Sequence, residues 1–381
     1  MKQPVGRRRS HGTPLFRFSS FYTRLRFILI LLAFVALLPP VYFHFKLRRL
    51  HQTKLRKCGW LNNPPLVCAH GGDSTNAFPN TMSAYSIALH SQVDCIEIDV
   101  SRSSDGVLFA LHDRDLQRIS GNSTSKVGHF RSNEVKIFLT GSSLSLLRLG
   151  AIKILAVAKS FCSFVGTICK GESHHELIHQ HACNLGDFQT LPNDFENLKL
   201  KELDVYHQSG NSKIPTIEDA LKLISASVRQ VILDAKVGPP SYEKGLANDI
   251  LSTVEKMQCK NCLIWAKSDS LVRDIIKLSS DVAVGYVVMV DPHTGARTNL
   301  LRMKGPKVAG VYHQLIDERM VKILHGREKK VYAWTVDDVD SMMRMLHMRA
   351  DAIVTSNPTL LQRTMQDKRT QCLEEGFSLT R

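Results

Sequence analysis

The sequence predicts an α/β fold built on a parallel β-sheet, either open or closed into a barrel. Short apolar runs with strand-like composition recur along the chain, and segments with helical apolar spacing separate many of them. Nine runs are candidate strands: 66–69, 95–100, 107–111, 231–236, 263–267, 282–288, 308–312, 330–335 and 352–355.

Helical spacing marks the segments between these runs. The candidate helices are 76–90, 217–226, 246–256, 271–278, 318–325 and 339–348. Nine strands are one more than an eight-stranded barrel needs, so one of them is misassigned or peripheral. Residues 101–106 are too few for a crossover helix, so a regular barrel must be interrupted there.

The net charge of the 381-residue chain is +15, but it is concentrated near the N-terminus. Residues 1–57 hold thirteen Lys and Arg and no Asp or Glu, which leaves about +2 for the rest of the chain. A nucleic-acid partner for the body is therefore not expected. Residues 1–26 are interpreted as a basic tail.

Residues 27–45 carry no formal charge and are long enough to span a bilayer. We expect a transmembrane anchor, with a cleaved signal peptide as the alternative. Pro39 and Pro40 should end or kink this helix. Residues 46–64 form a basic linker that either lies on anionic headgroups or is solvated.

Basic residues flank both ends of the span, so the positive-inside rule gives a near tie. We favour a single-pass protein whose body is lumenal or extracytoplasmic rather than cytosolic. In that orientation the sequon Asn122-Ser123-Thr124 becomes a candidate site of N-glycosylation.

The nine cysteines show no spacing typical of a disulfide framework, and Cys259-x-x-Cys262 lacks the second cysteine pair that a zinc site would need. We interpret Cys262 as a core strand residue and Cys259 as an incidental loop thiol.

Residues 137–200 do not fit the βα alternation and are interpreted as an insertion, poorly ordered or the product of aberrant splicing. Their apolar middle carries charges that argue against a second span. A cluster of four histidines is a candidate metal site: His174, His175, His179 and His181. Cysteine or carboxylate ligands in a recognisable spacing do not accompany it, which argues against metal binding.

Three strand-like runs between residues 66 and 113 end in side chains that can do chemistry. Glu97 and Asp99 are two apart, so they point to one face of a strand. The apolar neighbours Ile96, Ile98 and Val100 predict that the strand is buried, and two buried carboxylates call for a cation such as Mg²⁺ or Ca²⁺. His70 and His112 lie at the ends of the two other runs and form a candidate acid–base pair.

Together these motifs resemble the glycerophosphodiester phosphodiesterase family over most of residues 65–360, apart from the insertion. The matching segments are His70-Gly71-Gly72, Pro79-Asn80-Thr81, Glu97-Ile98-Asp99-Val100, the run from Asp105 to Asp113, Leu233-Asp234-Ala235-Lys236 and Trp334-Thr335-Val336-Asp337. The arrangement is most similar to a plant membrane-anchored member.

The resemblance implies a TIM-type (β/α)8 barrel of the phospholipase C-like (PLC-like) phosphodiesterase kind over residues 65–365, followed by a tail at 366–381. It implies metal-dependent hydrolysis of glycerophosphodiesters, deacylated phospholipids such as glycerophosphocholine, to an alcohol and sn-glycerol 3-phosphate. A neighbouring substrate hydroxyl would attack phosphorus, and water would open the resulting cyclic phosphate. We expect His70 to be the base and His112 the acid, although the order could be reversed.

Five more positions are candidates for metal, phosphate or substrate binding. Asp234 is the expected third metal ligand after Glu97 and Asp99. Lys236 is expected to bind phosphate oxygens. Asn80 and Trp334 are candidate substrate-binding or pocket-wall residues, as is Ser268 with less support.

Three positions depart from the family pattern. Gly71 stands where the family has Arg, and Asp234 stands where the family usually has Glu. The family's Pro-Glu-Asn-Thr segment reads Phe78-Pro79-Asn80-Thr81 in this chain, so its Glu is absent. The losses at position 71 and in the Pro-Glu-Asn-Thr segment favour the alternative of a non-catalytic barrel that binds a phosphorylated ligand or partner. The sequence does not determine the headgroup, the metal or the oligomeric state.

Overall fold

The computed structural model describes residues 17–139, 214–291 and 294–378, which form two compact units. The first unit contains one long helix, α1 (Arg17–Cys58), and the second is the barrel that starts at Trp60. Most of the interpreted insertion, with its histidine cluster, lies outside the described residues.

Helix α1 includes the whole apolar span, and its large apolar side chains are exposed. It is the one helix of the described residues that is long and apolar enough to cross a membrane. It does not end at Pro39-Pro40 but continues through the basic segment to Cys58. Of the two effects expected from the prolines, an end or a kink of the helix, the end does not occur.

Eight parallel strands close into a barrel, as the resemblance predicted; the apolar pattern alone predicted a parallel sheet, either open or closed. They pair in the order β1-β2-β4-β5-β6-β7-β8-β9, and β9 pairs back with β1. Their bounds are β1 Leu66–His70, β2 Cys95–Arg102, β4 Gln230–Ala235, β5 Cys262–Ala266, β6 Ala283–Val288, β7 Val308–Tyr312, β8 Lys330–Trp334 and β9 Ala352–Thr355.

The ninth strand, β3 (Leu108–Ala110), is peripheral and antiparallel to the end of β2. Residues 103–107, which are too few for a crossover helix, form the hairpin turn between β2 and β3. The barrel wall is not broken, since β2 also pairs directly with β4. The interruption affects only the alternation of strand and helix.

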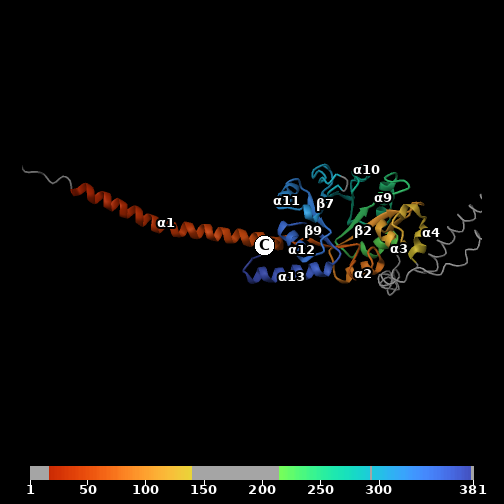
Figure 1. The fold of residues 1–381 in the computed structure, drawn as a ribbon, viewed down its shortest axis with the longest axis horizontal. Helices are drawn as coiled ribbons and strands as arrows, with labels where there is room; N and C mark the ends of the chain where they lie inside the picture. The colour runs from red at the N-terminus through yellow and green to blue at the C-terminus, as the bar shows by residue number, and fades with distance from the viewer. Residues whose placement is uncertain (1–16, 140–213, 292–293, 379–381) are drawn as a thin grey trace, which may run out of the picture. The chain divides into compact units, whose positions relative to one another are not determined.

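Helices surround the strands, and Figure 1 shows β2 and β9 at the centre of this unit. Their bounds are α2 Met82–His90, α3 Asp113–Ser120, α4 Ser132–Leu139, α8 Ile217–Ile224, α9 Leu246–Lys256, α10 Asp269–Leu278, α11 Glu318–His325, α12 Val339–Met348 and α13 Pro358–Glu374. Three short 3-10 turns are η1 Gly59–Asn62, η2 Val127–His129 and η3 His313–Leu315. Residue 365, the predicted end of the barrel domain, falls inside α13.

Strand alternation divides the core into two layers. On β2, Ile96, Ile98 and Val100 belong to the large cluster between the strands and the helices. Cys95 belongs to the smaller cluster that fills the barrel interior. The same period of two therefore directs Glu97 and Asp99 inward, above that interior cluster.

Two disulfides lie in the barrel. Cys68 on β1 pairs with Cys95 on β2, and Cys259 pairs with Cys262. The interpretation of Cys259 as an incidental loop thiol was wrong: the turn that follows α9 brings it beside the first residue of β5.

Candidate active site

The strand register brings the predicted residues together. His70, the last residue of β1, is the Cα partner of Glu97 on β2. Asp99, one pleat further along β2, is the partner of Asp234 on β4. Parallel strands of a barrel end on the same face, so these side chains converge at its carboxyl end.

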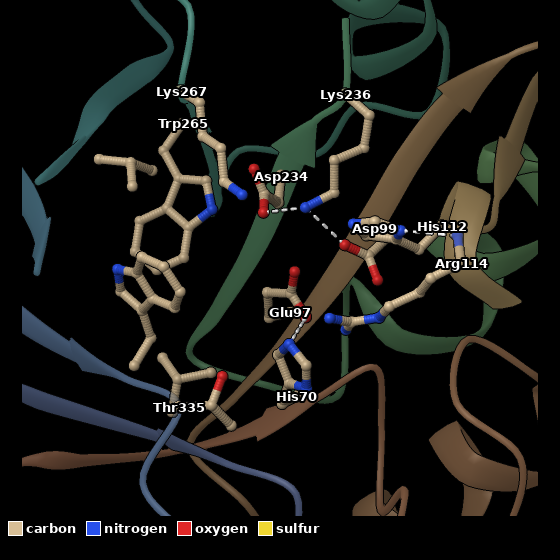
Figure 2. Close-up of a pocket in the computed structure, with 13 residues that line it drawn as sticks. His70, Glu97, Asp99, His112, Arg114, Asp234, Lys236, Trp265, Lys267 and Thr335 are labelled. Carbon is tan, nitrogen blue, oxygen red and sulfur yellow. Dashed lines mark hydrogen bonds and ion pairs between the residues drawn. The ribbon is translucent and has the colours of Figure 1, made fainter. Parts of the chain in front are cut away.

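A cavity of about 70 Å³ opens among these residues. Figure 2 shows the labelled side chains of β1, β2 and β4 pointing into it. Its lining includes most of the predicted site residues: His70, Glu97, Asp99, His112, Asp234, Lys236 and Trp334.

The three predicted metal ligands form one acidic cluster. Ligand oxygens of Glu97, Asp99 and Asp234 all lie within 4.8 Å of one another. Glu97 and Asp99 are only 1% and 2% exposed. The Oδ1 atom of Asp234 is buried without a hydrogen-bond partner among the described residues. An all-oxygen set with an unsatisfied buried atom fits a hard divalent cation, so these residues could hold a metal ion.

Lys236 neutralises part of this cluster. Its Nζ lies 2.7 Å from Asp99 Oδ1 and also contacts Asp234 Oδ2 closely. Burial alone would lower the pKa of Lys236, but Asp234 and then Asp99 hold it well above its ordinary value. Lys236 therefore remains charged, and its ammonium is committed to the two aspartates.

The acids differ in their ionisation. Burial and then the charge of Asp99 raise the pKa of Glu97 well above its ordinary value. Burial would also raise the pKa of Asp99, but Lys236 and then His70 hold it below its ordinary value. The site therefore keeps Asp99 ionised and tends to protonate Glu97, whose Oε2 accepts a hydrogen bond from Gly71 N at 3.0 Å.

His112 follows β3 and is the N-cap of α3. Its Nδ1 accepts a hydrogen bond from the backbone N of Arg114 at 3.1 Å. The proton of the neutral ring therefore lies on Nε2, which leaves a donor for the cavity. Burial lowers the pKa of His112 to about 4 and also lowers the pKa of His70. Both rings are thus neutral at pH 7.

Asn80 lies behind the site rather than on the cavity wall. It is fully buried, its Nδ2 donates to Asp99 Oδ2 at 2.8 Å, and its Oδ1 accepts from Asp99 N at 3.1 Å. Tyr85 OH also donates to Asn80 Oδ1. Both ends of the amide are thus bound to protein, so we infer that Asn80 orients Asp99 rather than contacting substrate.

Ser268 also makes protein contacts instead of lining the cavity. Its hydroxyl caps α10 by accepting from Leu271 N, and it donates to Glu243. The indoles of Trp265 and Trp334 both line the cavity, and the Nε1 of each lacks a hydrogen-bond partner among the described residues.

Sequence reasoning missed six lining residues: Arg114, Trp265, Lys267, Val287, Thr335 and Val354. Three of them carried a signal. Lys267 directly follows β5, Thr335 directly follows β8, and Arg114 lies two residues after His112. Position after a strand end, which identified the other residues, would also have found these.

Comparison with known proteins agrees with this geometry. A family model described as glycerophosphoryl diester phosphodiesterase family matches residues 70–360. The chain is 53% identical over 364 residues to glycerophosphodiester phosphodiesterase GDPD4 of Arabidopsis thaliana, which covers 95% of this chain and 92% of that protein. The expected likeness to a plant member is confirmed.

Solved structures share the barrel. A glycerophosphodiester phosphodiesterase from Parabacteroides distasonis has a TM-score of 0.52 and 16% identity, over 81% of this chain and 98% of that one. The Oleispira antarctica phosphodiesterase in complex with the product sn-glycerol-3-phosphate has a TM-score of 0.53 and 18% identity, over 79% and 97%. The fold matches these structures, and the family model and the plant relative extend the match to sequence: the chain belongs to the glycerophosphoryl diester phosphodiesterase family.

Proposed function

We propose that the protein hydrolyses glycerophosphodiesters, deacylated phospholipids such as glycerophosphocholine, to an alcohol and sn-glycerol 3-phosphate. One observation carries the proposal: two neutral imidazoles, three clustered carboxylates and a charged lysine converge on one cavity at the carboxyl end of the barrel. Phosphodiester hydrolysis needs these three elements, since a proton must leave the nucleophile, another must reach the departing oxygen, and negative charge must be stabilised.

The two histidines divide the proton transfers. His70 is neutral because burial lowers its pKa, so it can accept the proton of the substrate hydroxyl that attacks phosphorus. His112 presents Nε2–H because Nδ1 serves as the helix cap, which suits donation to the departing oxygen. Donation requires the charged ring, in which Nδ1 also carries a proton and no longer accepts the hydrogen bond from Arg114 N. The nearby phosphodiester anion favours that charged form. Water then opens the cyclic phosphate, and the same groups act in reverse roles.

Glu97, Asp99 and Asp234 would hold the cation, which we propose to be Mg²⁺ or Ca²⁺ because every ligand is a carboxylate oxygen. Such an ion supplies charge stabilisation for the phosphoryl oxygens. Lys236 adds a fixed positive charge at the cluster, Asn80 orients Asp99, and Trp334 forms part of the wall against which substrate carbons pack.

Turnover of glycerophosphocholine by the full-length protein in detergent tests this function. Release of sn-glycerol 3-phosphate is expected with Mg²⁺ or Ca²⁺ and not with chelator. Binding of sn-glycerol 3-phosphate without turnover under every metal condition would support the non-catalytic barrel instead.

We propose further that α1 anchors the protein and that the barrel faces the lumenal or extracytoplasmic side. The apolar, exposed span of α1 supports the anchor. The disulfides Cys68–Cys95 and Cys259–Cys262 support the side, because structural disulfides persist in oxidising compartments and are rare in the cytosol.

This orientation predicts N-glycosylation of Asn122 in eukaryotic membranes. Asn122, Ser123 and Thr124 are all exposed, and Asn122 Oδ1 accepts hydrogen bonds from the backbone N and the hydroxyl of Thr124 at 2.9 and 2.8 Å. Glycosidase treatment should increase the gel mobility of the wild type and leave Asn122→Gln unchanged. Asn133→Gln, which lies outside any sequon, is the control and should behave as wild type. A wild-type protein in intact microsomes that is unmodified and open to added protease would place the barrel in the cytosol.

A further inference from the structure

Arg114 extends a free positive charge into the active-site cavity. It is the second residue of α3, it lines the cavity, and its side chain is exposed. Figure 2 shows it reaching toward the space bordered by His70, Glu97 and Asp99. Within the described part of the chain, its guanidinium makes no hydrogen bond or ion pair.

Two other cations line the cavity, Lys236 and Lys267, and Lys236 is not free in this way. The ammonium of Lys236 contacts both Asp99 and Asp234. Arg114 therefore offers the cavity a positive charge that is not paired with any acidic side chain of the described residues. Its influence reaches both histidines. The positive charge of Arg114 contributes to the lowered pKa of His70 after burial, and to the lowered pKa of His112 after burial and the charge of Lys236.

Position 71, directly after His70, cannot supply a guanidinium. Gly71 has φ +63°, and a Cβ there would lie 3.0 Å from the Cβ of Pro79. Its backbone N already donates to Glu97. The first turn after β1 thus gives the site backbone contacts but no cation, whereas α3 places Arg114 in the lining of the same cavity.

We propose that Arg114 binds the non-bridging oxygens of the substrate phosphate and does the work that a glycine at position 71 cannot do. A guanidinium presents two parallel N–H donors that match a phosphate. The proposal rests on the proposed function for the identity of the phosphate, a glycerophosphodiester, but the binding itself can be measured without turnover.

The test compares Arg114→Gln and Arg114→Lys with Arg118→Gln in the full-length protein. Arg118 lies one turn later on α3, where its guanidinium pairs with Asp115 Oδ1 at 3.4 Å and lies over the Phe78 ring, so it is a matched control outside the cavity. Calorimetric titration with sn-glycerol 3-phosphate and with inorganic phosphate should show roughly ten- to a hundredfold weaker binding for Arg114→Gln. Arg114→Lys should lose less, and Arg118→Gln should bind as wild type.

Two readouts separate phosphate binding from a structural role. Inhibition by glycerol alone should be the same in Arg114→Gln and wild type, and the melting temperatures should agree because the side chain is exposed. Equal affinity of Arg114→Gln and wild type for both phosphate ligands would overturn the proposal even if wild-type turnover is normal. Conversely, weaker binding in Arg114→Gln with no turnover in wild type would uphold Arg114 as the phosphate ligand and remove the proposed enzyme activity.

Discussion

Replacing His112 with asparagine should lower kcat/KM for glycerophosphocholine by about 10²- to 10⁴-fold, the range expected for loss of one acid–base group. Asparagine is chosen because His112 has two roles. Its Nδ1 caps α3 through Arg114 N, and asparagine is a favourable N-cap residue that can accept the same hydrogen bond. The variant should therefore keep its fold while losing the imidazole.

Alanine at the same position separates the two roles. His112→Ala should lose activity to the same extent and should also lose about 1 kcal/mol of stability with the cap. His129→Asn is the matched control, because His129 is exposed at the end of η2 and does not line the cavity. Steady-state kinetics and thermal melting measure both effects. Wild-type activity in His112→Asn would exclude an acid role for this ring.

The part of the site that sequence could predict follows from strand geometry. The period of two along β2 places Glu97 and Asp99 on the face opposite Ile96 and Ile98, and apolar content fixes which face meets the helices. Parallel strands then bring their carboxyl ends to one edge. His70 and Asp234 join the cluster for that reason, without any knowledge of individual contacts.

What could not be predicted depends on loops and on long-range register. Asn80 lies in the turn before α2, and only the folded chain shows both ends of its amide bound to Asp99. Cys68 and Cys95 meet because β1 and β2 pair in that register. The direction of Arg114 depends on how α3 starts after β3, which the apolar pattern does not specify. Arg114 and Lys267 could have been found from their positions after strand ends, but both are exposed and leave little trace in the hydrophobic pattern.

Removal of divalent metal should abolish turnover, and return of Mg²⁺ or Ca²⁺ should restore it. The cluster of Glu97, Asp99 and Asp234 has an unsatisfied buried oxygen and more acid than Lys236 alone can neutralise. Binding should also raise the melting temperature by several degrees, since a ligand at a hundredfold excess over its Kd stabilises the folded state by about 2.7 kcal/mol. The thermal shift reports metal binding independently of catalysis.

Glutamine at position 97 tests whether the cluster acts as a metal site or only as structure. Because the pKa of Glu97 is raised in the folded state, the metal-free wild type should lose stability as pH increases above the ordinary value of 4.5. A cation that replaces the proton restores that stability, so the metal-induced thermal shift should grow with pH. Glu97→Gln should lose both the pH-dependent decline and the shift, while its metal-free form remains at least as stable as wild type.

The half-exposed Glu218, which pairs with Lys256 on the surface, provides the control, and Glu218→Gln should respond to metal as wild type does. A purely structural cluster would give a different pattern. Glu97→Gln would then melt at a lower temperature without metal, and neither protein would shift when metal is added. Retention of the full thermal shift in Glu97→Gln would place the ion elsewhere. Loss of the metal-induced thermal shift together with preserved metal-free stability in Glu97→Gln is expected only if the buried Glu97 carboxylate binds the cation and is unfavourable without it.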